Sequence, residues 1–205
     1  MTRSRGFWNL IARRYARQPV ADQAAYDYKL AQTKALLDPD MHLFEFGCGT
    51  GTTALIHAPF VAQIDAIDYA PQMIAIANSK KGTAQNVNFA VSTLRDWPAA
   101  DASYDMILGM SILHLLPDRH GALDHVNRLL KPGGYFVTST VCLRDMGPLV
   151  NALLPIGAAL RVLPRVVSLD APQLEQDFKQ AGFAIRQSWR PHAKGDVFHI
   201  CQKPR

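Results

Sequence analysis

The 205-residue sequence predicts an α/β fold, in which a mostly parallel sheet carries helices on both faces and ends in an antiparallel strand. Three observations favour this class. Short apolar segments alternate along the chain with longer segments of helical periodicity. A glycine-rich turn follows the first apolar segment, as it does in nucleotide-type sites. The last two apolar segments are joined only by residues 191–195, too few for the crossover that parallel strands require.

Two helices are expected before the sheet, over residues 5–17 and 20–37. In the second helix, Leu30 and Thr33 recur at helical spacing, and Asp38-Pro39 ends the helix. Together these helices form an N-terminal cap over residues 1–38. Because neither a repeat nor a flexible linker interrupts the sequence, residues 1–205 are expected to form one domain.

Strands and helices then alternate to the end of the chain. The expected strands cover residues 42–46, 61–67, 87–91, 104–108, 135–141, 183–190 and 197–202. The expected helices cover residues 52–57, 71–81, 118–130 and 172–181. Pro71 suits the first turn of its helix, and Gly182 suits the position just beyond a helix end.

The composition is that of a globular protein, since 48% of the residues are hydrophobic and 19% are charged. A net charge of +5 is compatible with an anionic substrate, a membrane surface or nucleic acid, and equally with a solvated helix face. The three cysteines lack paired spacing, so we expect free thiols and a cytoplasmic protein. The densest basic cluster comprises Arg3, Arg5, Arg13, Arg14 and Arg17.

The glycine-rich turn favours a cationic ligand over a dinucleotide. Gly47, Gly49 and Gly51 follow the spacing G-x-G-x-G, whereas the dinucleotide fingerprint is G-x-G-x-x-G. Glu45 precedes the glycines, where it would repel a pyrophosphate and attract an ammonium or sulfonium group. Asp68 ends the next strand, and its two oxygens can accept hydrogen bonds from both hydroxyls of a ribose.

Several segments resemble those of the class I S-adenosylmethionine-dependent methyltransferases, and in particular their small-molecule, quinone-methyltransferase-like members. The segments are Glu45–Gly51, Asp68-Tyr-Ala-Pro-Gln-Met73, Phe89–Asp105 and Leu129-Leu-Lys-Pro-Gly-Gly-Tyr135. The resemblance covers roughly residues 40–140. It implies a Rossmann-like, seven-stranded sheet of order 3-2-1-4-5-7-6 with strand 7 antiparallel, and it implies S-adenosylmethionine as the cofactor.

The resemblance also implies roles for individual residues. The glycines would shape the turn around the methionine part of the cofactor, with Glu45 orienting the turn or its ammonium group, and Asp68 would hold the ribose. Where many members carry an aspartate after the third strand, this chain has Ser92-Thr93-Leu94. Packing is the alternative reading for several of these positions. Tyr69 and Met73 would flank the adenine, and Thr93 could accept from its amino group. The remaining expected cofactor contacts are Tyr15 (with Tyr26 as a second lid aromatic), Leu94 and Gly109.

The acceptor is less clearly indicated. His114 is the candidate general base, with capping or packing as the alternative. No Asn/Asp-Pro-Pro-Tyr motif follows the fourth strand, so nucleic acid is not expected as a substrate. His120 and His125 are five residues apart and predict no metal site. The apolar segment 146–167 predicts an acceptor pocket or lid, a peripheral membrane contact, a dimer interface or simple core packing. Monomer and homodimer both remain open.

The leading hypothesis is methyl transfer, by in-line displacement, to a small, fairly apolar acceptor. Methylation of a phospholipid head group at a membrane surface is one alternative, and cofactor binding without catalysis is another.

Overall fold

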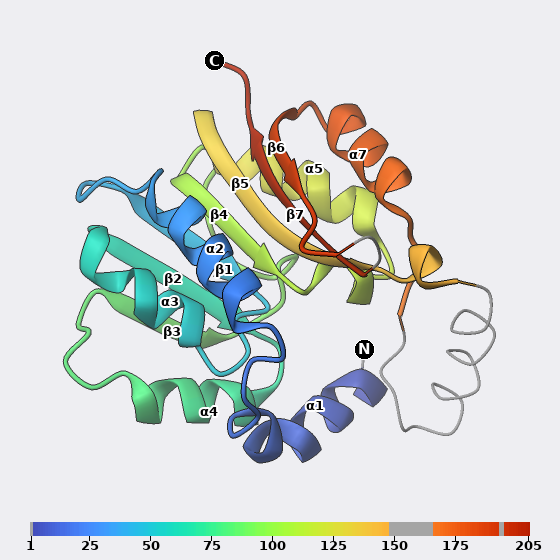
Figure 1. Ribbon diagram of the computed structural model, residues 1–205. Helices are drawn as coiled ribbons and strands as arrows, with labels where there is room; N and C mark the ends of the chain where they lie inside the picture. The colour runs from blue at the N-terminus through green and yellow to red at the C-terminus, as the bar shows by residue number, and fades with distance from the viewer. Residues whose placement is uncertain (1, 148–165, 193–194) are drawn as a thin grey trace. The chain divides into compact units, whose positions relative to one another are not determined.

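The computed structural model describes residues 2–147, 166–192 and 195–205, and its seven strands form one sheet of order β3-β2-β1-β4-β5-β7-β6 (Figure 1). Strand β1 pairs in parallel with β2 and β4, and β2 pairs in parallel with β3. Strand β7 is antiparallel to both β5 and β6. The predicted fold class and strand order are confirmed. The strands are β1 (His42–Phe46), β2 (Gln63–Asp68), β3 (Val87–Val91), β4 (Tyr104–Met110), β5 (Leu130–Cys142), β6 (Ala184–Trp189) and β7 (Gly195–Gln202).

The described helices fall close to the predicted ranges. They are α1 (Thr2–Tyr15), α2 (Gln23–Lys34), α3 (Thr52–His57), α4 (Pro71–Lys80), α5 (Arg119–Leu129) and α7 (Ala171–Gln180), with short 3-10 turns at Ala58–Phe60, Leu113–Leu115 and Leu143–Met146. Three begin behind an aspartate whose side chain accepts from a backbone N–H of the first turn, namely Asp22, Asp118 and Asp170. None of the described helices is long and apolar enough to cross a bilayer.

The chain divides into two compact units. The first contains Met1–Pro98 with Tyr104–Leu108, and the second contains Ala99–Ser103 with Gly109–Arg205. The expectation of one domain over residues 1–205 therefore stays a prediction. The predicted pocket or lid at 146–167 lies mostly in residues 148–165, outside the described residues.

In the first unit, a polar network ties together the strands at their amino ends. Asp65 is 6% exposed and accepts from Asn88 Nδ2 at 3.0 Å and from the Tyr104 hydroxyl at 3.1 Å. His42 Nε2 lies 3.0 Å from the same carboxylate. Because these partners come from β1, β3 and β4, Asp65 of β2 joins all four parallel strands. The glycine turn lies at the opposite end of β1, its carboxyl end.

In the second unit, α5 and α7 are held together by a buried ion pair. Arg119 Nε donates to Asp177 Oδ2 at 2.7 Å, and the Asp177 side chain is fully buried. Phe178 of α7 meets Phe136 of β5 edge to face, with ring centroids 6.0 Å apart. These contacts fix both helices to the part of the sheet formed by β5, β7 and β6.

Strand β5 begins earlier than predicted. The sequence predicts that Lys131-Pro-Gly-Gly separates a helix from a strand starting at Tyr135, but β5 starts at Leu130. The N–H of Gly133 donates to the carbonyl of Lys203, and the N–H of Lys203 donates to the carbonyl of Gly134. The C-terminal residues thus continue the ladder past β7, so the Pro-Gly-Gly segment is extended while still ending α5.

Candidate cofactor-binding site

All three glycines of the turn have backbone conformations that favour glycine. Their φ angles are +68° at Gly47, +55° at Gly49 and +74° at Gly51. The N–H of Cys48 donates to the carbonyl of Ile67 at 2.9 Å, which anchors the turn to the end of β2. The G-x-G-x-G spacing therefore reflects three positions of the turn between β1 and α3 that each have a positive φ.

Gly51 is also fixed by packing. A Cβ at this position would lie 2.6 Å from Phe89 Cζ and 2.9 Å from Ala77 Cβ, which are overlaps that real side chains do not tolerate. Gly49 differs, because a Cβ there would meet only the Tyr15 ring, at 3.8 Å. The turn is thus closed toward β3 and α4 at Gly51 and open at Gly49, where a ligand can approach the backbone.

Glu45 lies at the end of β1 and is 2% exposed. Its carboxyl group accepts a hydrogen bond from the N–H of Ala54, in the first turn of α3. Its Oε2 atom is buried and has no hydrogen-bond partner among the described residues. Burial raises the pKa of Glu45 to about 8, the Ala54 hydrogen bond opposes this rise, and Asp68 adds to it. One carboxyl group therefore caps a helix and also keeps an unused acceptor beside the turn.

Asp68 holds the glycine turn from the neighbouring strand. Its Oδ2 accepts from the N–H of Gly49 at 3.1 Å, and its Oδ1 accepts from the N–H of Ala70 at 2.8 Å. Burial raises the pKa of this carboxyl group, while the two N–H donors act in the opposite direction. Because each carboxylate oxygen has two lone pairs, Asp68 keeps one acceptor position on each oxygen for a ligand.

Helix α1 places Tyr15 over the turn. Ala12 is fully buried and packs with Ala70 and Met73, which brings the end of α1 against α4 (Figure 1). Tyr15 follows one turn later, and its ring is the group closest to the open side of Gly49. Tyr26 of α2, the other predicted lid residue, instead hydrogen-bonds Thr53 at the start of α3.

The residues predicted to flank adenine differ in exposure. Met73 is 2% exposed and belongs to the apolar cluster with Ala12, so its packing role is shown and its contact with adenine stays a prediction. Tyr69 is half-buried, and so is Leu94, another predicted cofactor contact. The side chains of these residues all belong to the first unit, together with the glycine turn.

Asp96 is a candidate residue that the sequence reasoning missed. The hydroxyl of Thr93 donates to Asp96 Oδ2 at 2.6 Å, and the N–H of Asp96 lies 3.3 Å from the same hydroxyl. A carboxylate therefore accompanies Thr93 even though the position after β3 lacks an aspartate. The signal available in the sequence was the Thr-x-x-Asp spacing, which is typical of a hydroxyl–carboxylate turn.

The second unit contains the remaining predicted residues, Gly109 and His114. The carbonyl of Gly109 accepts from the Thr138 hydroxyl at 2.7 Å, which ties β4 to β5. Ser111 has a φ of +55°, an unusual conformation for a residue other than glycine, and its N–H donates to the Ser139 carbonyl at 2.7 Å. The segment leaving β4 is therefore held in one strained arrangement.

His114 is 9% exposed, and its Nδ1 is buried without a partner among the described residues. Burial lowers the pKa of the imidazole, whereas the negative charge of Asp196 raises it. Because burial has the larger effect, His114 is neutral at pH 7 and can accept a proton. Asp196 was not identified from the sequence, since it acts on His114 from a strand 82 positions further along the chain.

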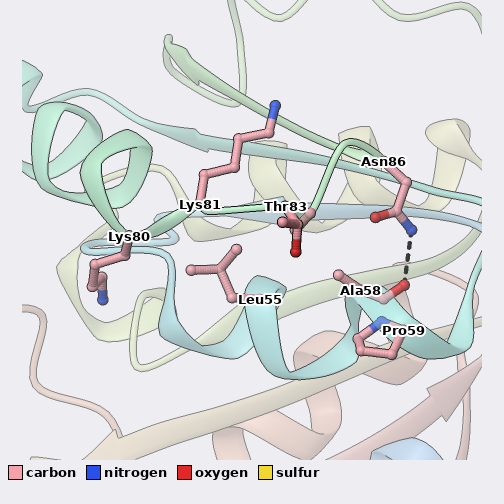
Figure 2. A pocket seen from close by; sticks show the side chains of 8 residues that line it. Leu55, Ala58, Pro59, Lys80, Lys81, Thr83 and Asn86 are labelled. Atoms are coloured by element: carbon pink, nitrogen blue, oxygen red, sulfur yellow. Dashed lines mark hydrogen bonds between the residues drawn. The ribbon is translucent and has the colours of Figure 1, made fainter.

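A cavity of about 380 Å³ lies elsewhere in the first unit, where α3 and α4 end (Figure 2). Its lining includes Lys80, Lys81 and Asn86. The Asn86 amide donates to the carbonyls of Ala58 and Val61, so this side chain braces the backbone. Lys80 Nζ donates to the hydroxyls of Thr50 and Thr52, and so ties α4 to the glycine turn and to the start of α3. We assign no ligand to this cavity, because it contains none of the predicted site residues.

The strand order, the glycine turn and the two buried carboxyl groups define the class I S-adenosylmethionine-dependent methyltransferases. In agreement, the family model described as "Methyltransferase domain" matches residues 44–138. Residues 44–138 are therefore a methyltransferase domain, as the resemblance of the motifs predicts, and its cofactor is S-adenosylmethionine.

Individual relatives share this class. An O-methyltransferase from Penicillium expansum is 28% identical over 200 residues, which cover 92% of this chain and 70% of that protein. A ubiquinone biosynthesis O-methyltransferase from Xanthomonas axonopodis pv. citri is 32% identical over 143 residues, which cover 67% of this chain and 58% of that enzyme. The chain thus spans little more than half the length of the Xanthomonas enzyme.

Solved structures share the fold of this chain. The crystal structure of an S-adenosylmethionine-dependent methyltransferase from Mesorhizobium loti aligns with a TM-score of 0.73 at 16% identity, covering 88% of this chain and 99% of that one.

The side chains around the turn fit this cofactor. S-adenosylmethionine carries an ammonium group, a sulfonium group and a ribose with two hydroxyls. The unpartnered Oε2 of Glu45 offers an acceptor to a cation, and Asp68 offers one further acceptor position on each oxygen. Gly49 leaves its backbone open to the ligand. No described group of three or more His, Cys, Asp or Glu residues could hold a metal ion.

Proposed function

We propose that the chain transfers a methyl group from S-adenosylmethionine to a hydroxyl group of a small, fairly apolar acceptor. The observation that carries the proposal is the pair of buried carboxyl groups at the glycine turn, one of which has an unused oxygen. Two curated relatives are named as O-methyltransferases, which supports oxygen as the acceptor atom.

In this proposal the chain's own residues bind and align the cofactor. Glu45 Oε2 accepts from the ammonium group, and the free lone pairs of Asp68 accept from the ribose hydroxyls. The adenine amino group donates to the hydroxyl oxygen of Thr93 and to the carboxylate of Asp96. Tyr15 covers the turn above Gly49 and limits the access of water. When bound, S-adenosylmethionine supplies an electrophilic methyl group on a positively charged sulfur.

His114 is proposed to take the proton of the acceptor hydroxyl. Bound S-adenosylmethionine would supply the methyl group to the acceptor oxygen, and its sulfur would keep the electron pair of the broken bond, so the chain's own part would be to remove the hydroxyl proton. The hydroxyl proton moves to the neutral imidazole, because an alkylated oxygen cannot keep it. Such a base contributes on the order of 10²–10⁴-fold to the rate of a reaction that needs proton removal.

The activity is tested by turnover of methyl-labelled S-adenosylmethionine with a panel of catechols, phenols, primary amines and thiols. We expect methylated product with at least one hydroxyl compound and a molecular mass increase of one methyl group. Cofactor binding without product from any of these acceptors would contradict the proposed reaction.

The role of His114 is tested with two phenols of similar shape, one ionised and one neutral at the assay pH. The variant His114→Gln is expected to lose activity on the neutral phenol and to keep most of it on the ionised one. A purely structural role would lower both rates alike. His125→Gln serves as the matched control, since this histidine lies on α5 and contacts Arg128.

A further inference from the structure

Helix α1 and the residues just after it carry the whole net charge of the chain. Residues 1–20 contain five arginines and neither aspartate nor glutamate. The chain as a whole has 22 basic and 17 acidic residues, so residues 21–205 contain 17 of each. The net charge of +5 therefore equals the charge of this one N-terminal segment, which belongs to the first unit.

The inner face of α1 is occupied by packing within the first unit. Trp8 and Ala12 pack against Ala70 and Met73 at the start of α4. The side chain of Asn9 accepts from the N–H of Gln72 at 3.0 Å. Since α4 lacks a cap from its own N-cap residue Ala70, Asn9 fulfils that function from another helix. These contacts fix which side of α1 faces outward.

The outer face combines apolar and basic side chains. Leu10 is 84% exposed, more than any other large hydrophobic residue in the described part of the chain. Phe7 and Arg14 lie three residues before it and four residues after it, so all three share one side of the helix. Arg13, Arg14 and Arg17 are exposed and have no carboxylate partner among the residues that the structure describes. We call this surface, formed by Phe7, Leu10, Arg13, Arg14 and Arg17, the outer α1 face.

We propose that the outer α1 face binds an anionic lipid surface. A helix with apolar residues on its exposed side, flanked by arginines, suits the boundary between lipid head groups and acyl chains. Leucine and phenylalanine enter the apolar region while arginine heads stay with the phosphates. Nucleic acid phosphates would attract the arginines equally, but they would leave Leu10 and Phe7 in water. The apolar centre of the face therefore favours lipid.

A lipid surface bound at the outer α1 face would lie close to the glycine turn. Tyr15 belongs to the same helix and lies beside Gly49. A lipid surface held on the outer side of α1 would thus lie one helix diameter from the turn, about 10 Å away. This inference is independent of the proposed acceptor, because it concerns charge and exposure on α1 alone.

The test is co-sedimentation of the full chain with vesicles of phosphatidylglycerol and phosphatidylcholine, or of phosphatidylcholine alone, at low salt. We expect binding to the first and little to the second, with loss of binding at high salt. Arg14→Glu should weaken binding between about fivefold and thirtyfold, since each basic residue near an anionic surface contributes about fivefold. Leu10→Ser should weaken it severalfold.

Two variants serve as matched controls. Lys179→Glu reverses one exposed charge on α7, and Ile56→Ser removes an apolar side chain of α3 that is 37% exposed. Both should bind vesicles within about twofold of the unchanged chain. Thermal unfolding of all four variants checks that they are folded. Absence of binding to anionic vesicles, equal losses in the α1 variants and the controls, or retention by duplex DNA and not by vesicles would each overturn the proposal.

Discussion

The N–H of Gly49 donates a 3.1 Å hydrogen bond to Asp68 Oδ2, so the carboxylate expected to hold the ribose also holds the glycine turn. Binding of the ribose and shaping of the turn are therefore coupled through one side chain. A change at Asp68 should affect both, and the two effects can be measured separately.

Asp68→Ala should weaken S-adenosylmethionine binding by about 1–3 kcal/mol, the range for losing hydrogen bonds to a charged group. It should also speed hydrogen exchange at the Gly49 amide, which loses its acceptor. Asp40→Ala is the control, since that carboxylate is exposed and precedes β1, at the opposite end of this strand from the turn. An unchanged dissociation constant, measured by calorimetry, would rule out the ribose assignment.

Cofactor binding should release protons from Glu45. Its pKa is raised to about 8, so at pH 7 most molecules carry a neutral carboxyl group, whereas an ammonium ligand favours the charged form. The affinity should therefore rise with pH, by at most about tenfold for each pH unit below 8, and level off above it. Calorimetry in two buffers of different ionisation enthalpy measures the released protons. Glu45→Gln should abolish this release, and an equal release in that variant would refute the assignment.

Gly51→Ala should destabilise the protein by about 2 kcal/mol or more, because the φ of +74° and the overlap with Phe89 both oppose a side chain. Chemical unfolding followed by circular dichroism gives the free energy. Gly6→Ala is the matched control, since a Cβ at this helical position meets nothing within 4 Å. That variant should be neutral or more stable by up to about 1 kcal/mol. Equal effects of the two substitutions would show that the turn tolerates a side chain.

Acid should destabilise the fold through His57. Both ring nitrogens of His57 are buried without a partner among the described residues, and burial, aided by the charge of Lys34, lowers its pKa to about 4. The unfolded chain, with an ordinary pKa of 6.5, binds the proton more tightly. Stability from this group is therefore present above pH 6.5 and is lost as the pH falls toward 4, by about 3 kcal/mol at most. His57→Leu should flatten this part of the stability curve, and an unchanged slope would contradict the attribution.

The parts of the fold that depend on residues close together in the sequence were predictable. The bounds of β1, α3 and β3 agree with the prediction, because alternation, turn glycines and caps act within a few residues. The start of β5 was not predictable, since it depends on Lys203 about 70 residues away. The same holds for Asp65, whose partners come from three other strands.

The candidate site was predictable to a similar degree. Glu45 and Asp68 could be named because a carboxylate before a glycine turn, or at a strand end, has a direct chemical meaning. The hydrogen bonds that they accept, Glu45 from the N–H of Ala54 and Asp68 from the N–H of Gly49, follow only from the folded backbone. Asp96 was missed because its carboxylate meets Thr93 across a turn, and Asp196 because its charge acts over a long sequence separation.

The Asp65 network has a consequence for insertions and deletions in β1. His42 fixes one end of this five-residue strand at Asp65, and Glu45 must reach the amide of Ala54 at the other end. Side chains alternate between the two faces of a strand, and Phe44 stacks on Tyr104 on the face opposite Glu45. Adding or deleting one residue would turn the carboxyl group into that aromatic stack. Homologous sequences should therefore vary in the apolar residues of β1 and keep its length constant.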